Sequence, residues 1–263
     1  MLKPLVLGDR EHFAEGVTKS GLKFIAGCDK GFNYKINEDN EDRVVICPEE
    51  DCFAAIDGMG GLMGGKFGAD TISEALSQNP RKPLEALNLA QKKMKDSDRY
   101  GAACIMIAHA QDSVIETYQA GDVKRLLQYK RTLLQRLFCL KSYSESEDQT
   151  MAKYGRPNVV TKKIDRDECC PTVDHLKVAK ALRLMLYSDG VSSNINSIEM
   201  IQLSQGRTLQ ELFTQVWQIT EQRMKNNEHI IATGKRGRWR KTYCDGFSLK
   251  PRPDNRSFVA VDF

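Results

Sequence analysis

Hydrophobic residues along this chain fall into short runs of two kinds. Runs that are apolar and rich in β-branched side chains, or that alternate with a period of two, predict β-strands. Eight stretches have this pattern: 22–30, 42–47, 52–57, 103–110, 113–121, 125–129, 182–190 and 256–263. Apolar positions three or four residues apart predict one helix pair over 66–78 and 83–97, and a second pair within 197–228.

The order of these elements predicts an α+β fold. Strands are followed by a helix pair, more strands, the second helix pair and a last strand, as expected for two antiparallel sheets with helices outside. Two segments fit this order poorly. Residues 139–175 are polar with few periodic cues, and we interpret them as a flap or long loop. Residues 233–242 form a basic loop with five basic residues around Trp239.

Length and composition limit the possible classes of protein. With 263 residues, 41% of them hydrophobic, the chain can form one large domain, which we expect to span 1–263. The net charge of +4 neither requires nor excludes an anionic partner. No run of about 18 apolar residues predicts a membrane span, and the N-terminus lacks the apolar core of a secretory signal. We therefore expect the protein in the cytoplasm of the producing cell, or exported without a readable signal.

Acidic residues recur where the predicted strands begin or end. They are Glu38 and Asp39 before one strand, Asp57 and Asp189 at the ends of two others, and Asp254 before the last. In antiparallel sheets the end of one strand neighbours the start of the next, so these carboxylates can meet on one rim. Mg²⁺ and Mn²⁺ prefer such oxygen ligands. Asp-Gly and Asn-Asp are also ordinary turn sequences, so the metal hypothesis depends on all of them together.

Five short motifs resemble, in order and approximate spacing, those of the metal-dependent protein phosphatases of type 2C. They are Asn-Glu-Asp at 37–39, Ala-Ala-Ile-Asp-Gly-Met-Gly-Gly at 54–61, Gly-Asp at 121–122, Leu-Tyr-Ser-Asp-Gly-Val at 186–191 and Asp-Asn at 254–255. The resemblance runs from about Gly21 to Phe263 and is to compact bacterial-type members. It implies a sandwich of two antiparallel sheets flanked by helix pairs, with two Mg²⁺ or Mn²⁺ ions at one end.

The resemblance also implies individual roles at this metal centre. Asp57 would bridge the two ions, and the carbonyl of Gly58 would bind one of them. The remaining ligands would be Asp39, Asp189 and Asp254, with Glu38 acting through water. Catalysis is then expected to depend on Asp57, Asp39 and Asp189.

The chain departs from the family pattern at several of these positions. Asp122 is a candidate ligand for a third ion, although Ser193 stands where many members have the second aspartate of that pair. Tyr34 stands where an arginine often holds the substrate phosphate, which leaves Lys35 as the candidate phosphate-binding residue. Lysine cannot reproduce the bidentate contact of a guanidinium. Met59 replaces a histidine that can act as an acid, so water would protonate the leaving alkoxide.

The implied reaction is hydrolysis of phosphoserine and phosphothreonine on proteins by a hydroxide held between the two ions. The substrate would be a phosphorylated protein in a signalling pathway, and the enzyme would be a monomer. The preference for serine and threonine over tyrosine depends on the resemblance alone.

Two alternatives stay open. A pseudophosphatase, with the same fold used as a protein-binding module, is favoured by Tyr34, Ser193 and the sequence Gly-Asp-Val-Lys-Arg at 121–125. The complete set of strand-end aspartates opposes it. Nucleic-acid binding through the basic loop at 233–242 is the other, and it would depend strongly on salt. We favour instead a loop that attracts acidic or phosphorylated substrates.

Overall fold

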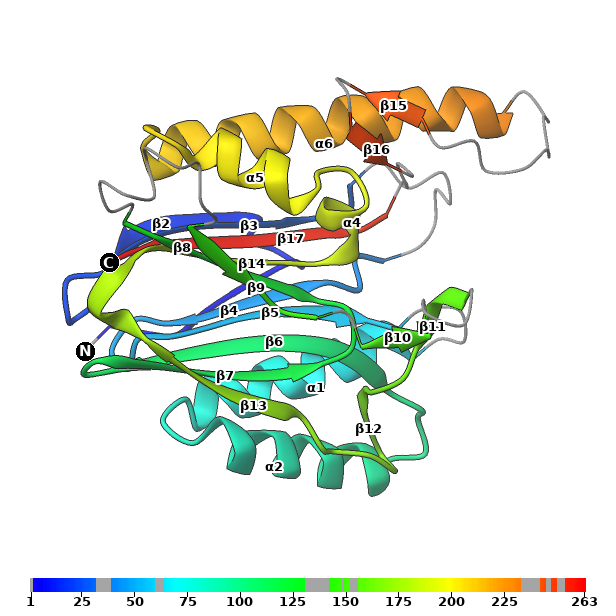
Figure 1. Ribbon diagram of the computed structural model, residues 1–263. Helices are drawn as coiled ribbons and strands as arrows, with labels where there is room; N and C mark the ends of the chain where they lie inside the picture. The colour runs from blue at the N-terminus through cyan, green and yellow to red at the C-terminus, as the bar shows by residue number, and fades with distance from the viewer. Residues whose placement is uncertain are drawn as a thin grey trace.

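The computed structural model describes residues 2–31, 39–59, 64–130, 142–147, 149–151, 156–232, 242–244, 247–249 and 254–263. Its main body is a pair of antiparallel β-sheets packed face to face, with helices on both outer faces (Figure 1). This architecture confirms the predicted α+β sandwich flanked by helices.

The first sheet has the strand order β1–β4–β5–β6–β7–β13, with β12 also paired to β6. Its strands are β1 (Leu5–Leu7), β4 (Arg43–Cys47), β5 (Cys52–Gly58), β6 (Ala102–Gln111), β7 (Val114–Ala120), β12 (Ile164–Asp165) and β13 (Thr172–Lys177). Helices α1 (Gly65–Gln78) and α2 (Pro83–Lys95) cover its outer face. Apolar side chains of both helices, including Ile72 and Leu87, pack there against Ile56 and Ile105.

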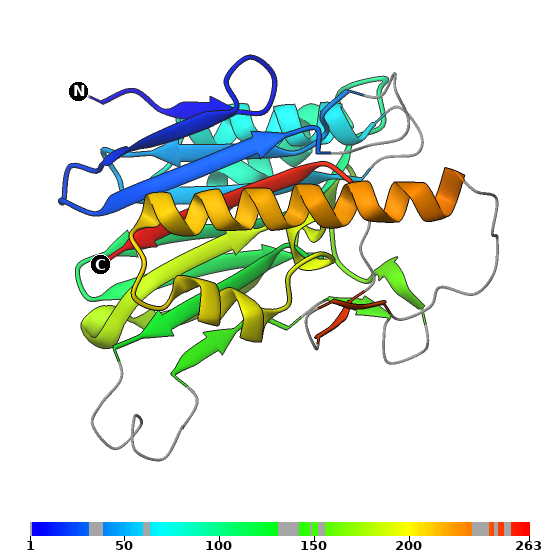
Figure 2. The same ribbon diagram turned by 90° about the horizontal axis from the view of Figure 1, so that it is seen from above.

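The second sheet has the order β2–β3–β17–β14–β8–β9. Its strands are β2 (Phe13–Val17), β3 (Lys23–Asp29), β8 (Lys124–Tyr129), β9 (Tyr143–Glu145), β14 (Ala181–Tyr187) and β17 (Arg256–Asp262). Its outer face carries α4 (Asp189–Ser192), α5 (Ser197–Ser204) and α6 (Leu209–Ala232). Seen from above, α6 runs along β17 and β3 (Figure 2).

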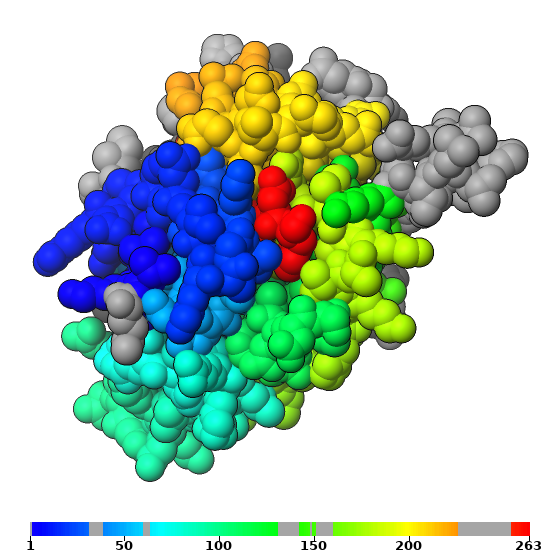
Figure 3. Space-filling view, turned by 90° about the vertical axis from the view of Figure 1, so that its left-hand side faces the viewer, coloured from blue at the N-terminus to red at the C-terminus, as the bar shows by residue number. Residues whose placement is uncertain are grey.

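The central strands of each sheet are buried on both faces, which explains their nearly continuous apolar sequences. In β17, Val259 and Val261 face the other sheet, whereas Phe258 and Ala260 face the helices. The alternation gives three apolar layers: one between the sheets and one beneath each helical layer. Seen from one end of the sandwich, the C-terminal segment (red) lies between the N-terminal strands (blue) and the segments drawn in green (Figure 3).

Several elements are present that the hydrophobic pattern does not predict. They are β1, β2, β9, β12 and β13, together with two hairpins, β10 (Thr150–Met151) with β11 (Arg156–Val160) and β15 (Thr242–Cys244) with β16 (Phe247–Leu249). The segment interpreted as a flap therefore contributes, in its described part, strands to both main sheets. The basic loop lies outside the described residues except for Thr242. Among the described residues, none of the helices is both long and apolar enough to span a membrane.

Candidate metal centre

Backbone pairing brings the acidic strand ends together at one end of the sandwich. Arg43 at the start of β4 pairs with Ile56 of β5, so the next residues along, Asp42 and Asp57, lie side by side. In the other sheet, Tyr187 at the end of β14 pairs with Phe258. The chain continues from there into Asp189, at the start of α4.

Asp57 lies at the centre of this carboxylate group. Its pKa is raised well above the ordinary value, first because the half-buried side chain has lost part of its water and then because other carboxylates lie close to it. Those carboxylates belong to Asp42, Asp189, Asp122 and Asp254. Five segments distant in sequence therefore each contribute one aspartate to the same place, and the structure brings the predicted Asp57, Asp189, Asp254 and Asp122 together.

Asp42 is the member of the group that sequence reasoning missed. It is 2% exposed, whereas the predicted Asp39 is exposed, so the structure places Asp42 rather than Asp39 beside Asp57. The sequence Asn-Glu-Asp occurs twice in succession, at 37–39 and at 40–42. The position of the following strand could have shown which copy belongs to the group, because Asp42 directly precedes β4. Glu38 and Lys35 lie outside the described residues, and their roles stay predictions.

Burial also perturbs Asp42 itself. Loss of water around its carboxyl raises the pKa to about 7; the Ser188 hydroxyl partly opposes this rise, and the charge of Asp254 adds to it. One carboxylate oxygen, Oδ2, is buried with no hydrogen-bond partner. An unpaired buried carboxylate oxygen is costly unless something positive binds it.

The glycine after Asp57 is required by close backbone packing. A Cβ on Gly58 would lie 2.5 Å from the carbonyl oxygen of Gly65 and 2.7 Å from that of Glu41. Gly58 therefore lets the start of α1 and the segment before β4 approach the end of β5. This explains part of the glycine-rich sequence after Asp57, while the metal-binding role of the Gly58 carbonyl stays a prediction.

The donor set suits a hard divalent cation. All five carboxylates offer oxygen, Asp42 has an unpaired oxygen, and the mutual repulsion of the group would be relieved by positive charge. Yet within the described part of the chain no three Asp, Glu, His or Cys side chains are grouped closely enough to hold a metal ion. The chemistry therefore fits Mg²⁺ or Mn²⁺, and the side chains would have to close on an ion as it binds.

The metal-free protein should lose stability as the pH rises from about 5 to 8. Folded Asp42 keeps its proton up to about pH 7, whereas in the unfolded chain its pKa returns to 3.8. Between these values the folded state binds more protons, so the free energy of unfolding falls with rising pH. Thermal melts in chelator across this range test the sign. Asp42→Asn should make the profile less steep, and the raised pKa of Asp57 should account for the slope that remains. A melting temperature that rises steadily from pH 5 to 8 would contradict this assignment.

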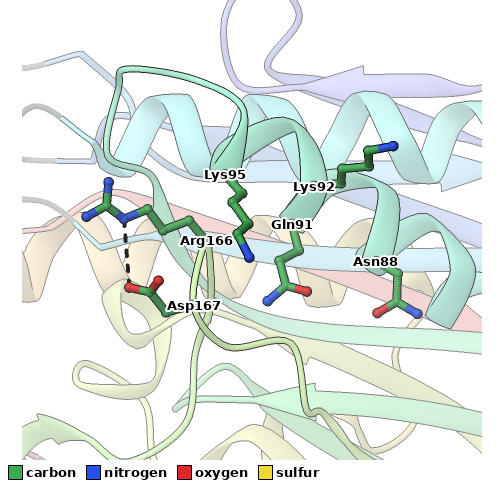
Figure 4. A pocket seen from close by; sticks show the side chains of 6 residues that line it. All are labelled: Asn88, Gln91, Lys92, Lys95, Arg166 and Asp167. Atoms are coloured by element: carbon green, nitrogen blue, oxygen red, sulfur yellow. Dashed lines mark ion pairs between the residues drawn. The ribbon is translucent and has the colours of Figure 1, made fainter.

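A separate surface pocket of about 250 Å³ lies between α2 and the loop after β12 (Figure 4). Its lining residues are Asn88, Gln91, Lys92, Lys95, Arg166 and Asp167, and the Arg166 guanidinium pairs with Asp167 at 3.7 Å. None of the five clustered aspartates lines it. It is therefore distinct from the candidate metal centre.

Comparisons with known proteins find the same fold in solved structures. No protein-family model matches the chain, and no curated protein sequence matches it. Solved structures do: PppA, a key regulatory component of T6SS in Pseudomonas aeruginosa, superimposes with a TM-score of 0.68 at 16% identity, over 92% of this chain and 97% of that one. The catalytic domain of the serine/threonine protein phosphatase PstP, in complex with two manganese ions, gives 0.67 at 17% identity, over 92% and 97%.

A third matching structure is also a serine/threonine phosphatase. The serine/threonine phosphatase Stp1 from Staphylococcus aureus superimposes with a TM-score of 0.59 at 13% identity, over all of this chain and 95% of that one. The identities are low, so the likeness concerns the fold. The chain thus has the fold of the serine/threonine protein phosphatases of type 2C, as its sequence motifs predict.

Proposed function

We propose that this protein is a metal-dependent phosphatase acting on phosphoserine and phosphothreonine in proteins. The observation that carries the proposal is the group of five aspartates centred on half-buried Asp57, at one end of a phosphatase fold. A group of like charges partly removed from water is unfavourable by itself and is typical of sites that bind a cation.

Four of the aspartates would hold two Mg²⁺ or Mn²⁺ ions. Asp57, at the centre of the group, would be shared between them, and Asp42, Asp189 and Asp254 would complete the ligands. Bound there, a pair of such ions supplies an activated water near neutral pH and positive charge opposite the phosphoryl oxygens. Asp122 also lies near Asp57 and would be the candidate ligand for a further ion.

The protein itself would orient the ligands and keep their charges in place. Ser188 and Ser257 lower the pKa of Asp42 against the effect of burial, which favours the charged form that binds a cation. No histidine follows the Asp57–Gly58 pair, so we assign the proton for the leaving group to water. Lys35 is our candidate for holding the substrate phosphate.

Phosphate release from phosphopeptides should require added divalent cation. The measurement uses protein purified in chelator, a panel of phosphoserine, phosphothreonine and phosphotyrosine peptides, and additions of Mn²⁺ or Mg²⁺. We expect turnover with serine and threonine peptides only when metal is present, because the proposed reaction takes its activated water and its positive charge from the ions. Asp57→Asn, purified in the same way, detects contaminating phosphatase, and Asp112→Asn, on the exposed β6–β7 turn, is the matched substitution away from the site.

Two outcomes would contradict the proposal. Equal turnover in chelator and in Mn²⁺ would exclude the metal mechanism. Absence of turnover from folded protein under every condition would favour the binding-module alternative.

A further inference from the structure

Asn255 joins the segments that carry the candidate ligands. It follows Asp254 directly and is 7% exposed. Its side-chain amide bonds two other segments at once: Nδ2 donates to the carbonyl of Lys30 at 3.2 Å, and Oδ1 accepts from the backbone N–H of Glu41 at 3.0 Å. One neutral side chain therefore fixes the end of β3 and the segment before β4 to the start of β17.

The backbone of Asn255 makes a third close contact. A Cβ added to Gly190 would lie 1.8 Å from the Asn255 carbonyl oxygen, so the start of α4 packs directly against this residue. The Asn255 N–H in turn donates to Oδ1 of Asp254 at 2.9 Å, which orients that carboxylate.

Two of the three partners of Asn255 adjoin an aspartate of the candidate metal centre in the sequence. Glu41 precedes Asp42 and Gly190 follows Asp189, while Asn255 itself follows Asp254. Each of these contacts thus lies one residue from an aspartate of the candidate metal centre. Asn255 therefore links the three segments that carry these aspartates.

We propose that Asn255 is a positioning residue that sets the spacing of Asp42, Asp189 and Asp254, and thereby the affinity of the site for divalent cations. The inference rests on the proposed function. Metal ligands must stand within a few tenths of an ångström of their final places, and clustered carboxylates push one another apart. An amide holds these segments without adding a further negative charge, and it uses donor and acceptor together, which neither a carboxylate nor an apolar side chain can do.

Asn255→Ala should weaken Mn²⁺ binding about tenfold or more, in line with the loss seen when partners that orient metal ligands are removed. The readout is Mn²⁺ binding without substrate, followed by the electron paramagnetic resonance signal of free Mn²⁺. The rise in melting temperature that saturating Mn²⁺ produces should also shrink. At saturating metal the variant should recover most of its kcat, because Asn255 does not contact the reacting phosphate in this assignment.

Ser204→Ala is the matched control. Ser204 is 3% exposed, donates to Gln128 at 2.6 Å and accepts from Arg183 at 3.2 Å. Arg183 also binds Asp262, so this network belongs to the opposite end of β17. Ser204→Ala removes two side-chain hydrogen bonds, as Asn255→Ala does, but it should leave Mn²⁺ affinity unchanged.

The outcomes distinguish failure of the positioning role from failure of the proposed function. Native protein that binds Mn²⁺ together with an Asn255→Ala variant that binds it equally well overturns the positioning role alone. Equal loss of affinity in both variants also overturns it, because a general loss of stability would then explain the effect. Native protein that binds no Mn²⁺ overturns the proposed function and this inference with it. If Asn255→Ala does not fold, Asn255→Ser is measured in the same way, with weaker binding expected and unchanged binding decisive against the role.

Discussion

Asp42→Asn is expected to reduce kcat/KM for a phosphopeptide by at least about 100-fold at fixed Mn²⁺, since removing even the partners of metal ligands costs 10- to 100-fold. The change keeps the shape of the side chain and removes the charge that would bind the ion. It should also make the metal-free protein more stable at pH 8, because one of several mutually repelling carboxylates is gone. Lower activity together with higher stability is the combination expected of a ligand and not of a residue needed for folding.

Asp39→Asn is the control for this prediction, and it tests the choice between the two copies of Asn-Glu-Asp. Asp39 is exposed, so its substitution should leave both activity and the pH profile of unfolding close to those of the native chain. Kinetic assays and thermal melts in chelator, run on both variants side by side, decide whether Asp39 or Asp42 belongs to the site. Loss of activity in Asp39→Asn with full activity in Asp42→Asn would reverse the assignment made from burial and register.

Gly31→Ala is expected to lower the free energy of unfolding by at least about 3 kcal/mol, in the range that steric overpacking reaches. Gly31 has φ +60°, and a Cβ there would lie 1.9 Å from the backbone carbonyl oxygen of Asp254. Relief requires either this turn or the segment that carries Asp254 to move. The variant should therefore also bind Mn²⁺ more weakly.

Gly206→Ala is the control that distinguishes the steric clash with Asp254 from the strain of a left-handed backbone. Gly206 has φ +70°, close to that of Gly31, but no atom lies within 4 Å of the position that its Cβ would occupy. Alanine there should cost only the left-handed backbone penalty, about 1–2 kcal/mol. Urea unfolding of both variants in chelator measures the difference. Equal losses would show that contact with Asp254 contributes nothing.

The sequence pattern located the central strands and long helices because these are buried and strongly periodic. The runs around β3, β5, β14 and β17 and the helices α1, α2 and α6 correspond closely to the predictions. The missed strands lie at sheet edges or are very short. In β13, for example, His175 and its neighbours are largely exposed, and β7 is its one partner among the described strands, so burial imposes little apolar pattern on it.

The residues of the candidate site also differ in how far local sequence could predict them. Asp57, Asp189 and Asp254 follow or precede strands whose ends the sequence indicates, and the structure brings them together. Asp42 was missed because two identical tripeptides adjoin, and only pairing with β5 shows which copy reaches the site. The bridging role of Asn255 could not be predicted either, since its partners Lys30 and Glu41 are more than 200 residues away.

Strand β17 has a consequence for the order in which this protein can assemble. It follows every other described strand in the sequence, yet it lies between β3 and β14, and the Asp29 carboxylate of β3 binds the Arg256 guanidinium across 227 residues. Contacts of such sequence separation close late and slow the folding of a domain. A growing chain therefore carries most of its clustered acids before it has the strand that joins their segments, and the candidate metal centre would be completed in a single step, when β17 inserts between its two neighbours.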